Sequence, residues 1–510
     1  MLDVMNCYLH GFVAIPVIQT GLHRGLFRVL SHEPLGLDSL SEKLGARSGH
    51  LAAALRLLES LGWIDSRDGL YKATTQAEQI RFVPDNALVL YPLAVAGTIA
   101  SSIQTHDLEA AIGAVCNRWN GAPELLAEFL DGTVIVPVLN ALLRDGGLQA
   151  WVDNDDGKST LFDGRAGEIL KRLFLAKNWA SETPAGLKAT EIGRFIADRG
   201  LVTGTTASYA PMLLRLDELI FGKADAVLAR AKDGHETHLD RALNIVASGF
   251  QHQRFFADLE DAVVAIFDQE PISSQPRFIV DTGCGDGTLL KTLYEAIRAR
   301  TRRGGALSDH PLVMVGADFN AEALEITGRT LRDIPHRLLQ VDIGDPARLA
   351  RDLAAEGAGD ADQVLHVRSF LDHDRPLLAA QDRARADDRA HLPYASVSVA
   401  DDGTLIPPGH AVQSLVEHLG RWAAVTGRHG LAILEVHALP PAVVRDHVEV
   451  SENLHFDAYH AFSRQHLVEA DTFIFAAAEA GLFPHRDAAR RYPHTQPFTR
   501  ITFNRFERCP

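Results

Sequence analysis

The sequence predicts an α/β protein in which a doubly wound domain follows a mostly helical region with two winged-helix-like repeats. Three observations predict it: a strand, glycine turn and helix at 278–290, alternating helix and strand patterns from about residue 240 onward, and a repeat within the first 235 residues. Parallel strands joined by helices build open, doubly wound, Rossmann-like sheets, and a pattern recurring at one offset indicates a duplicated module. We therefore expect domains at 1–118, 119–235 and 236–510.

Composition predicts a globular protein with a large core. The chain has 510 residues, 46% of them hydrophobic and 23% charged, and a formal net charge of −16. Nucleic acids are bound by clustered Lys and Arg, and no basic stripe occurs, so we expect no nucleic-acid partner. The four cysteines have neither metal nor disulfide spacing, which favours a reducing cytoplasm. The most apolar segment, 87–100, is interrupted by Pro92 and too short to span a membrane.

The front of the chain repeats itself. GFVAIPVIQTGL begins at Gly11 and GTVIVPVLNALL begins at Gly132, an offset of 121 residues (132 − 11 = 121). Farther along, Trp63 and Trp179 occupy matching positions in segments that each continue to Lys-Ala-Thr. In each copy, helical spacing of apolar residues precedes two short strand-like segments, which is a winged-helix pattern. We expect two copies of one module.

Winged helices bind DNA in many regulators, so one hypothesis is a transcription factor with a ligand-sensing domain. The expected recognition helix, 49–61, contains only His50 and Arg56 as basic residues, with Arg47 just ahead of it, and Glu59 opposes them. A DNA-reading helix needs more phosphate-contacting cations than this. The sequence therefore disfavours DNA binding.

The glycine turn predicts a cradle for a nucleotide-type ligand. Asp281 ends an apolar strand-like run and is followed by Gly283, Gly285 and Gly287, after which a helix begins. Glycines let the backbone turn sharply against a ligand, and the helix N-terminus offers free N–H groups. A dinucleotide site needs G-x-G-x-x-G, but here the third glycine falls one position early, and Asp281 would repel a pyrophosphate. A cationic or zwitterionic ligand suits the turn better, with a structural turn or an NAD site as the alternatives.

D-x-G-x-G-x-G resembles motif I of the class I S-adenosylmethionine-dependent methyltransferases. The resemblance implies that Asp281 and the three glycines hold S-adenosylmethionine. Asp318, at the end of the second strand, is placed to accept hydrogen bonds from both ribose hydroxyls, with a helix N-cap as its alternative role. Asp342 and Ile343 follow the third strand and would bind the adenine through a carboxylate and a backbone N–H. Arg368, in the fourth strand, completes the cofactor-binding candidates.

The winged module placed before such a domain resembles that of small-molecule O-methyltransferases, where it dimerises and closes over the partner's pocket. Those proteins carry one copy per chain. We expect the second copy here to replace the partner's domain, so that the chain works as a monomer, with a homodimer as the alternative. Leu371-Asp372-His373-Asp374 occupies the place of the Leu-His-Asp-Trp of that family, whose histidine is the general base. Because the histidine is shifted by one residue, both Asp372 and His373 are candidates for the base or for metal ligands.

Four segments, HVRSFLDHDRP, SLVEHL, LEVH and DAYHAFSRQHLVEAD, are similar to the mononuclear metal-dependent C-methyltransferases of polyketide assembly lines. Carried over by position, the resemblance implies His437, His460 and Gln465 as ligands of Fe(II) or Mn(II), which could acidify a carbon by polarising its neighbouring carbonyl. It predicts methylation of a keto acid or acyl thioester in specialised metabolism, with the acyl group free or tethered to a carrier protein. The alternatives are a metal-free O- or N-methyltransferase for a small molecule or amino acid, and a winged-helix regulator that senses S-adenosylmethionine.

Overall fold

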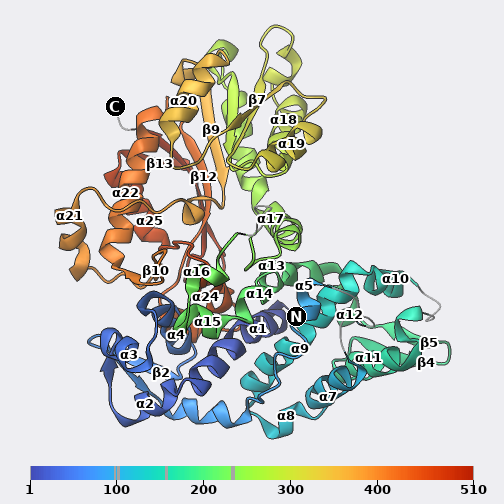
Figure 1. Cartoon of the computed structure of the whole chain (residues 1–510). Helices are drawn as coiled ribbons and strands as arrows, with labels where there is room; N and C mark the ends of the chain where they lie inside the picture. The colour runs from blue at the N-terminus through green and yellow to red at the C-terminus, as the bar shows by residue number, and fades with distance from the viewer. Residues whose placement is uncertain (1, 97–98, 100–103, 155–158, 231–235, 509–510) are drawn as a thin grey trace. The chain divides into compact units, whose positions relative to one another are not determined.

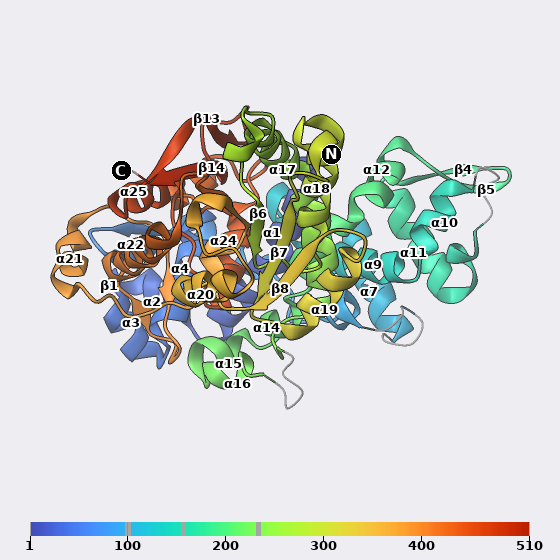
Figure 2. The ribbon, with the colours of Figure 1, turned by 90° about the horizontal axis from the view of Figure 1, so that it is seen from above.

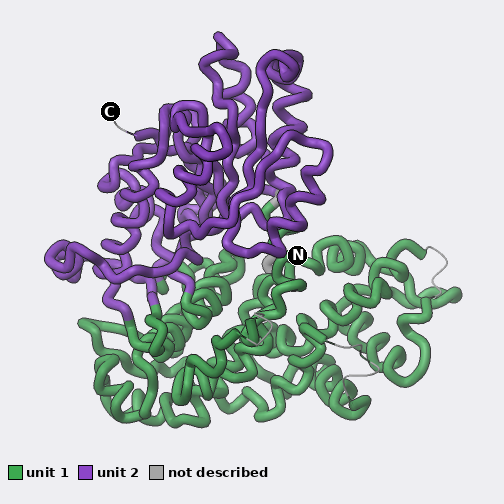
Figure 3. Tube along the Cα trace, turned by 45° about the horizontal axis from the view of Figure 1, so that its top comes forward, with its two compact units in different colours: residues 1–252, 399–405, 441–464 green, residues 253–398, 406–440, 465–510 purple. Residues whose placement is uncertain are grey.

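The computed structural model describes residues 2–96, 99, 104–154, 159–230 and 236–508. The chain divides into two compact units, coloured separately in Figure 3. Unit 1 contains residues 1–252, 399–405 and 441–464, and unit 2 contains 253–398, 406–440 and 465–510. Unit 1 thus combines both sequence repeats with two segments from the C-terminal half of the chain.

Unit 1 is mostly helical (Figure 1). Its first part contains α1 (Leu2–His23), α2 (Leu26–His32), β1 (Leu35–Gly36), α3 (Leu37–Leu44), α4 (Ser48–Ser60), β2 (Ile64–Arg67), β3 (Leu70–Ala73), α5 (Pro92–Val95), α7 (Thr105–Cys116) and α8 (Arg118–Gly121). Its second part contains α9 (Glu124–Arg144), α10 (Gly147–Asp153), α11 (Gly164–Ala176), β4 (Ala180–Thr183), β5 (Gly186–Ala189), α12 (Glu191–Arg199), α13 (Thr203–Ala207), α14 (Ala210–Leu213), α15 (Leu216–Phe221) and α16 (Ala224–Val227). Helix α17 (Arg241–Phe267) continues into unit 2, and α23 (Pro441–Asp446) and α24 (Asn453–Phe462) complete unit 1.

The two wings have the same internal pairing, which confirms two winged-helix-like repeats. Strands β2 and β3 pair antiparallel, as do β4 and β5, and each pair closes a tight hairpin. The Thr74 N–H donates to the Trp63 carbonyl at 2.9 Å, and the Thr190 N–H donates to the Trp179 carbonyl at 2.9 Å. The paired tryptophans of the sequence repeat therefore occupy equivalent places in the structure.

Helix α9 is the one helix of the described chain that is long and apolar enough to cross a membrane by length and composition. Of its most apolar stretch, 89% is buried inside the protein. The segment 87–100, which looked most apolar in the sequence, contributes the short helix α5 to the described part. Because α9 packs along α1, its apolar surface is that of a core helix.

Unit 2 is built on a seven-stranded sheet in the order β13-β14-β12-β9-β6-β7-β8. The strands are β6 (Phe278–Thr282), β7 (Val313–Asp318), β8 (His336–Gln340), β9 (Val364–Ser369), β12 (Leu431–Val436), β13 (Leu482–Tyr492) and β14 (Ile501–Arg508). The five strands from β12 to β8 are parallel, as the sequence predicts, and β14 and β13 add an antiparallel hairpin beside β12. The short strands β10 (Ser398–Val399) and β11 (Leu405–Ile406) form a separate ribbon.

Helices cover the sheet, as Figure 2 shows from above. They are α18 (Thr288–Arg300), α19 (Ala321–Thr330), α20 (Pro346–Ala355), α22 (Pro408–Val425) and α25 (Ala470–Glu479), and α21 (Arg383–Asp388) packs on α22. On one face, Phe278 and Val280 of β6 share a core cluster with residues of α20, α22 and α25, including the fully buried Trp422. The carboxyl ends of the parallel strands meet at one edge of this sheet, which is where open α/β sheets bind ligands.

Candidate active site

The glycine turn between β6 and α18 has the backbone that the sequence predicts. Gly283, Gly285 and Gly287 have φ values of 75°, 54° and 78°, a left-handed region that other residues adopt only under strain. A Cβ atom on Gly283 would lie 2.7 Å from a methyl group of Leu371, and one on Gly287 would lie 2.9 Å from Thr327. At Gly285 a Cβ atom would meet nothing within 4 Å. The turn is therefore packed at its two ends and open at its centre, as a ligand cradle requires.

Two carboxylates flank this open backbone. The Gly285 N–H donates to Asp318 at 3.2 Å, and the Asn320 N–H donates to the other oxygen of Asp318 at 2.9 Å. Asp281 is buried at the end of β6, and its Oδ1 has no hydrogen-bond partner among the described residues. Burial, and then repulsion by Asp318 and Asp286, raises the pKa of Asp281 well above its usual value. A cationic ligand would offset both effects, so the site fits the zwitterionic, sulfonium-bearing S-adenosylmethionine.

Asp342 and Ile343 follow β8 at the same edge. The Val341 N–H donates to the Asp318 carbonyl at 3.0 Å, which joins the two strand ends. Asp342 is exposed and accepts a hydrogen bond from the Gly344 N–H at 2.6 Å, whereas Ile343 is buried. The structure thus brings these two residues, Asp281, Asp318 and the glycine turn together at one edge of unit 2.

Arg368 makes a different contact from the one expected for a cofactor residue. It is fully buried, and its Nε and Nη2 donate to the two carboxylate oxygens of Asp372 at 2.7 Å each. Its guanidinium carbon lies 4.5 Å from the ring centroid of Trp422. Burial alone would raise the pKa of Asp372, but Arg368, His418 and Arg375 together more than offset it and lower that pKa to about 2. Arg368 therefore holds Asp372 ionised and in place, and its role toward the cofactor stays a prediction.

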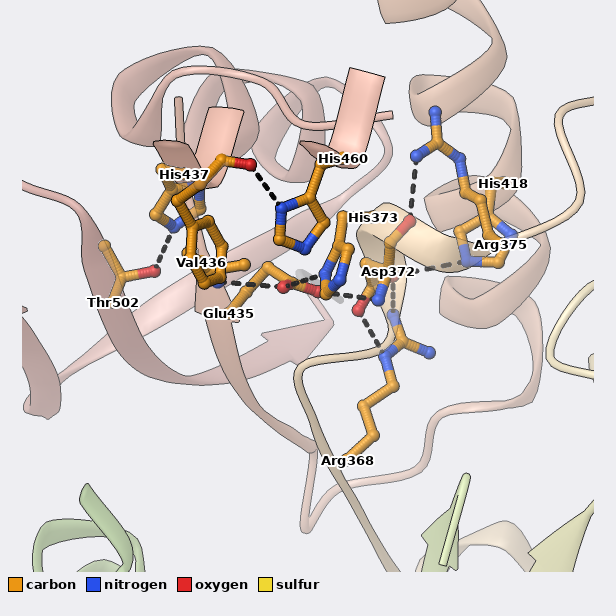
Figure 4. A network of polar contacts seen from close by, with 11 residues as sticks. Arg368, Asp372, His373, Arg375, His418, Glu435, Val436, His437, His460 and Thr502 are labelled. Carbon is orange, nitrogen blue, oxygen red and sulfur yellow. Dashed lines mark hydrogen bonds and ion pairs between the residues drawn. The ribbon is translucent and has the colours of Figure 1, made fainter. Parts of the chain in front are cut away.

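His373 forms a buried pair with Glu435, a residue that the sequence analysis did not single out. His373 Nδ1 lies 2.7 Å from Glu435 Oε1, which also accepts from the Val436 N–H at 2.8 Å (Figure 4). The other oxygen, Oε2, accepts from the Asp372 N–H at 2.6 Å. Burial lowers the pKa of His373, but the Glu435 carboxylate more than offsets it, so that the pKa is raised. A histidine oriented by a carboxylate is the usual form of a general base.

Glu435 could have been found in the sequence. It interrupts the otherwise apolar strand LAILEV, and a carboxylate in a strand buried on both faces needs a partner to be retained. The sequence analysis selected His437 at the tip of this strand instead.

The three expected metal ligands belong to different units. His437, in unit 2, shares a hydrogen bond with Thr502 Oγ1 at 2.8 Å, and burial lowers its pKa to about 3. His460 lies on α24 in unit 1, where its Nδ1 donates to the Phe456 carbonyl at 2.7 Å, and Gln465 belongs to unit 2. Across the described chain, no three His, Cys, Asp or Glu side chains are grouped as a metal ion requires. We therefore derive no step that passes through a metal, and the metal-ligand roles of these residues stay a prediction.

The parallel sheet, the glycine turn and the acidic strand ends define the class of the protein: a class I S-adenosylmethionine-dependent methyltransferase with a winged-helix N-terminal region. The profile of the family described as "AprA MT2-like domain" matches residues 236–504. Profiles described as "AprA winged helix domain" and "AprA N-terminal domain" match 131–223 and 1–66. The chain belongs to the AprA MT2-like methyltransferase family.

Solved structures with similar chains include proteins described as methyltransferases. An O-methyltransferase family 2 protein from Planctomyces limnophilus, in complex with apigenin, matches 100% of this chain and 96% of its own at 11% identity, with a TM-score of 0.44. The CurJ carbon methyltransferase matches 99% and 92% at 10% identity and a TM-score of 0.36. The DszA carbon methyltransferase matches 82% and 95% at 11% identity and a TM-score of 0.33. No protein with a curated function matches the sequence.

Proposed function

We propose that the protein transfers the methyl group of S-adenosylmethionine to an acceptor from which His373 removes the proton. The observation that carries the proposal is the pair of His373 and Glu435 at the ends of β9 and β12. Strand β9 lies between β12 and β6 in the sheet. The pair and the glycine turn after β6 are therefore at neighbouring positions along one sheet edge.

The hydrogen bond to Glu435 sets which nitrogen of His373 acts. Glu435 accepts from Nδ1, so the neutral imidazole carries its hydrogen there and keeps the lone pair on Nε2. Nε2 takes the proton of the acceptor, and the Glu435 carboxylate stabilises the imidazolium that forms. When bound, S-adenosylmethionine supplies a methyl group on a positively charged sulfur. That sulfur would keep the electron pair of the bond that it gives up to the acceptor.

For the acceptor we propose a carbon next to the carbonyl of a keto acid or acyl thioester in specialised metabolism. The proposal rests on the segments similar to C-methyltransferases, including LEVH, which contains Glu435. A small molecule or an acyl group on a carrier protein would serve. Oxygen or nitrogen acceptors are the second candidate, because their pKa values are closer to that of histidine than those of carbon acceptors are. General-base catalysis is more efficient when the pKa values of the base and the acceptor are similar. We propose a cytoplasmic location from the cysteine spacing.

Metal assistance by Fe(II) or Mn(II) is a separate proposal from the resemblance. Its test is elemental analysis of gently purified protein, compared with a His437→Ala, His460→Ala double variant. Near-stoichiometric iron or manganese in the wild type, lost in the variant, would support the metal. Metal-free protein after reconstitution would refute it without affecting the role of His373.

The proposed function is tested with methyl-labelled S-adenosylmethionine and a panel of keto acids, malonyl-type thioesters and phenols. Product mass identifies the methylated acceptor, and its NMR spectrum identifies the methylated atom. We expect His373→Gln to lower kcat by roughly 10²- to 10⁴-fold, while cofactor affinity measured by calorimetry is retained. His391→Gln, at an exposed histidine of the same unit, is the control and should keep full activity. Failure of the wild type to bind the cofactor would refute the function, and an unchanged kcat in His373→Gln would refute the base.

A further inference from the structure

The long helices α1 and α9 of the two repeats cross with their glycines in backbone contact. A Cβ atom on Gly11 would lie 1.9 Å from the carbonyl oxygen of Phe129, and one on Gly132 would lie 2.0 Å from the carbonyl oxygen of Tyr8. Phe129 is the counterpart of Tyr8 at the repeat offset of 121 residues, as Gly132 is of Gly11. Gly11 thus contacts Phe129, and its counterpart Gly132 contacts Tyr8, the counterpart of Phe129. The two contacts are therefore equivalent. Reciprocal contacts of this kind define an isologous interface, the two-fold arrangement of symmetric dimers.

The reciprocity extends to shorter helices. Helix α5 of the first repeat packs on α9 of the second, and α14 of the second repeat contacts α1 of the first. Both short helices begin with a proline in their first turn, Pro92 and Pro211. Arg144 of α9 fixes the first of these contacts by donating to the carbonyls of Leu93 at 2.5 Å and Ala94 at 2.8 Å. Each repeat thus packs one short helix on the long helix of the other.

The two copies differ on the winged-helix face that the C-terminal segments cover. In α4 this face carries Gly49, Ala52 and Arg56, which are all buried. The Gly49 N–H donates to the Gly403 carbonyl at 3.0 Å, and Arg56 forms a buried ion pair with Asp457 at 2.9 Å. Residues 399–405 and 441–464 of unit 1 therefore cover the first copy.

The corresponding face of α11 is charged and packs on α7. The tryptophans Trp63 and Trp179 set the local offset at 116 residues (179 − 63 = 116), which places Arg165, Glu168 and Arg172 opposite the three buried residues of α4. All three are exposed. Arg165 and Arg172 form ion pairs with Glu109 of α7, at 3.2 Å and 3.6 Å. The second copy keeps the module's pairing surface but not the face that receives C-terminal segments.

We infer that the two repeats form an internal pseudo-dimer, in which the second copy occupies the pairing surface of the first and the protein works as a monomer with one catalytic unit. A closed isologous interface leaves no equivalent surface for a second chain. The face of α11 that packs on α7 accommodates no second set of C-terminal segments. The inference concerns unit 1 alone and does not depend on the proposed chemistry.

Light scattering during size-exclusion chromatography of the full chain, over a wide range of concentration, tests the inference. The expected result is a single mass of 55.6 kDa at every concentration. A mass of two chains, or one that rises with concentration, would overturn it. Neither result depends on methyl transfer, so a failure here is distinguishable from a failure of the proposed function.

Thermal unfolding of glycine variants tests the helix crossing itself. Gly11→Ala and Gly132→Ala should each lower Tm by roughly 5–10 °C, because the added methyl overlaps backbone. Gly113→Ala, in a helix of the same unit where a Cβ atom meets only Arg172 at 4.0 Å, is the matched control and should not lower Tm. Equal Tm values for all three variants would overturn the reciprocal contact. If the two test variants cannot be purified, the mass of the wild type alone decides.

Discussion

Glu435→Gln tests the proposed base most selectively, because it removes a charge with little change of shape. The carboxylate accepts three hydrogen bonds, from His373 Nδ1 and from the N–H groups of Val436 and Asp372. A glutamine offers one oxygen in place of two, and its amide group would face one of these donors. The variant therefore loses the anion that stabilises protonated His373.

The expected loss follows from the energy of that bond. A hydrogen bond to a charged group contributes about 1.5–3 kcal/mol, and each 1.36 kcal/mol of barrier is tenfold in rate. We expect kcat to fall roughly 10- to 150-fold when the imidazolium loses Glu435. The glycine turn is unchanged, so the Kd of S-adenosylmethionine should be close to that of the wild type.

The pH dependence of kcat tests the direction in which Glu435 shifts the pKa of His373. In the wild type Glu435 raises the pKa of buried His373, and the base acts only when deprotonated, so activity should rise with pH through that raised pKa. In the variant, only the smaller effects of Asp374 and Asp372 still oppose burial, so the pKa of His373 falls. The rising limb should then move to lower pH with a lower plateau. Glu356→Gln, at an exposed ion pair with Arg337, is the control and should leave the profile unchanged. An unmoved limb or an unchanged plateau in Glu435→Gln would refute the dyad.

Three further predictions concern the carboxylates. Asp281→Asn should stabilise the cofactor-free protein and weaken cofactor binding. Folding raises the pKa of Asp281, so the free energy of unfolding of the wild type falls as pH rises through and above the ordinary Asp range. In thermal scans the variant should lack that fall. Asp318→Ala should raise the Kd of S-adenosylmethionine roughly 10- to 150-fold in calorimetry, because charged hydrogen bonds to the ribose are lost; an unchanged Kd would remove Asp318 from the site. Arg368→Met should lower the free energy of unfolding by about 3–5 kcal/mol in urea titrations, because it removes the partner that donates to both oxygens of the buried Asp372 carboxylate and leaves only His418, at 3.3 Å. A loss below about 1 kcal/mol, the worth of an exposed pair, would contradict the structural role of Arg368.

The cofactor side of the fold could be predicted because its signals are local. The glycine turn, Asp281 and the order of five strands are written in short stretches of sequence, and parallel topology then brings the strand ends to one edge. The hairpin of β13 and β14 was not predicted, because strand pairing depends on contacts that no local pattern specifies. The wings were predicted from matching tryptophans.

The catalytic side was harder to predict because its contacts are distant in sequence. His373 contacts Glu435, which lies sixty-two residues farther along the chain. Because the histidine is shifted by one residue, the sequence alone does not distinguish Asp372 from His373 as the base. The structure does, because Asp372 forms an ion pair with Arg368. The resemblance to metal-dependent C-methyltransferases placed His460 with His437 as metal ligands, which stays a prediction. The structure assigns α24 to unit 1, where Arg56 and Asp457 form a buried ion pair between segments about 400 residues apart.

Hydrogen exchange in the acceptor is the most direct test of proton removal by His373, because it requires no methyl transfer. The wild-type protein is incubated in D₂O with S-adenosylhomocysteine and with the unmethylated form of the acceptor that the panel identifies. Deuterium at the reacting carbon of this acceptor is followed by NMR. If His373 is the base for a carbon acceptor, the acceptor gains deuterium with the wild-type protein. With His373→Gln it does not, although this variant keeps its affinity for S-adenosylhomocysteine. Exchange at equal rates in both proteins, or methylation by the wild type at a carbon that never exchanges, would contradict the account.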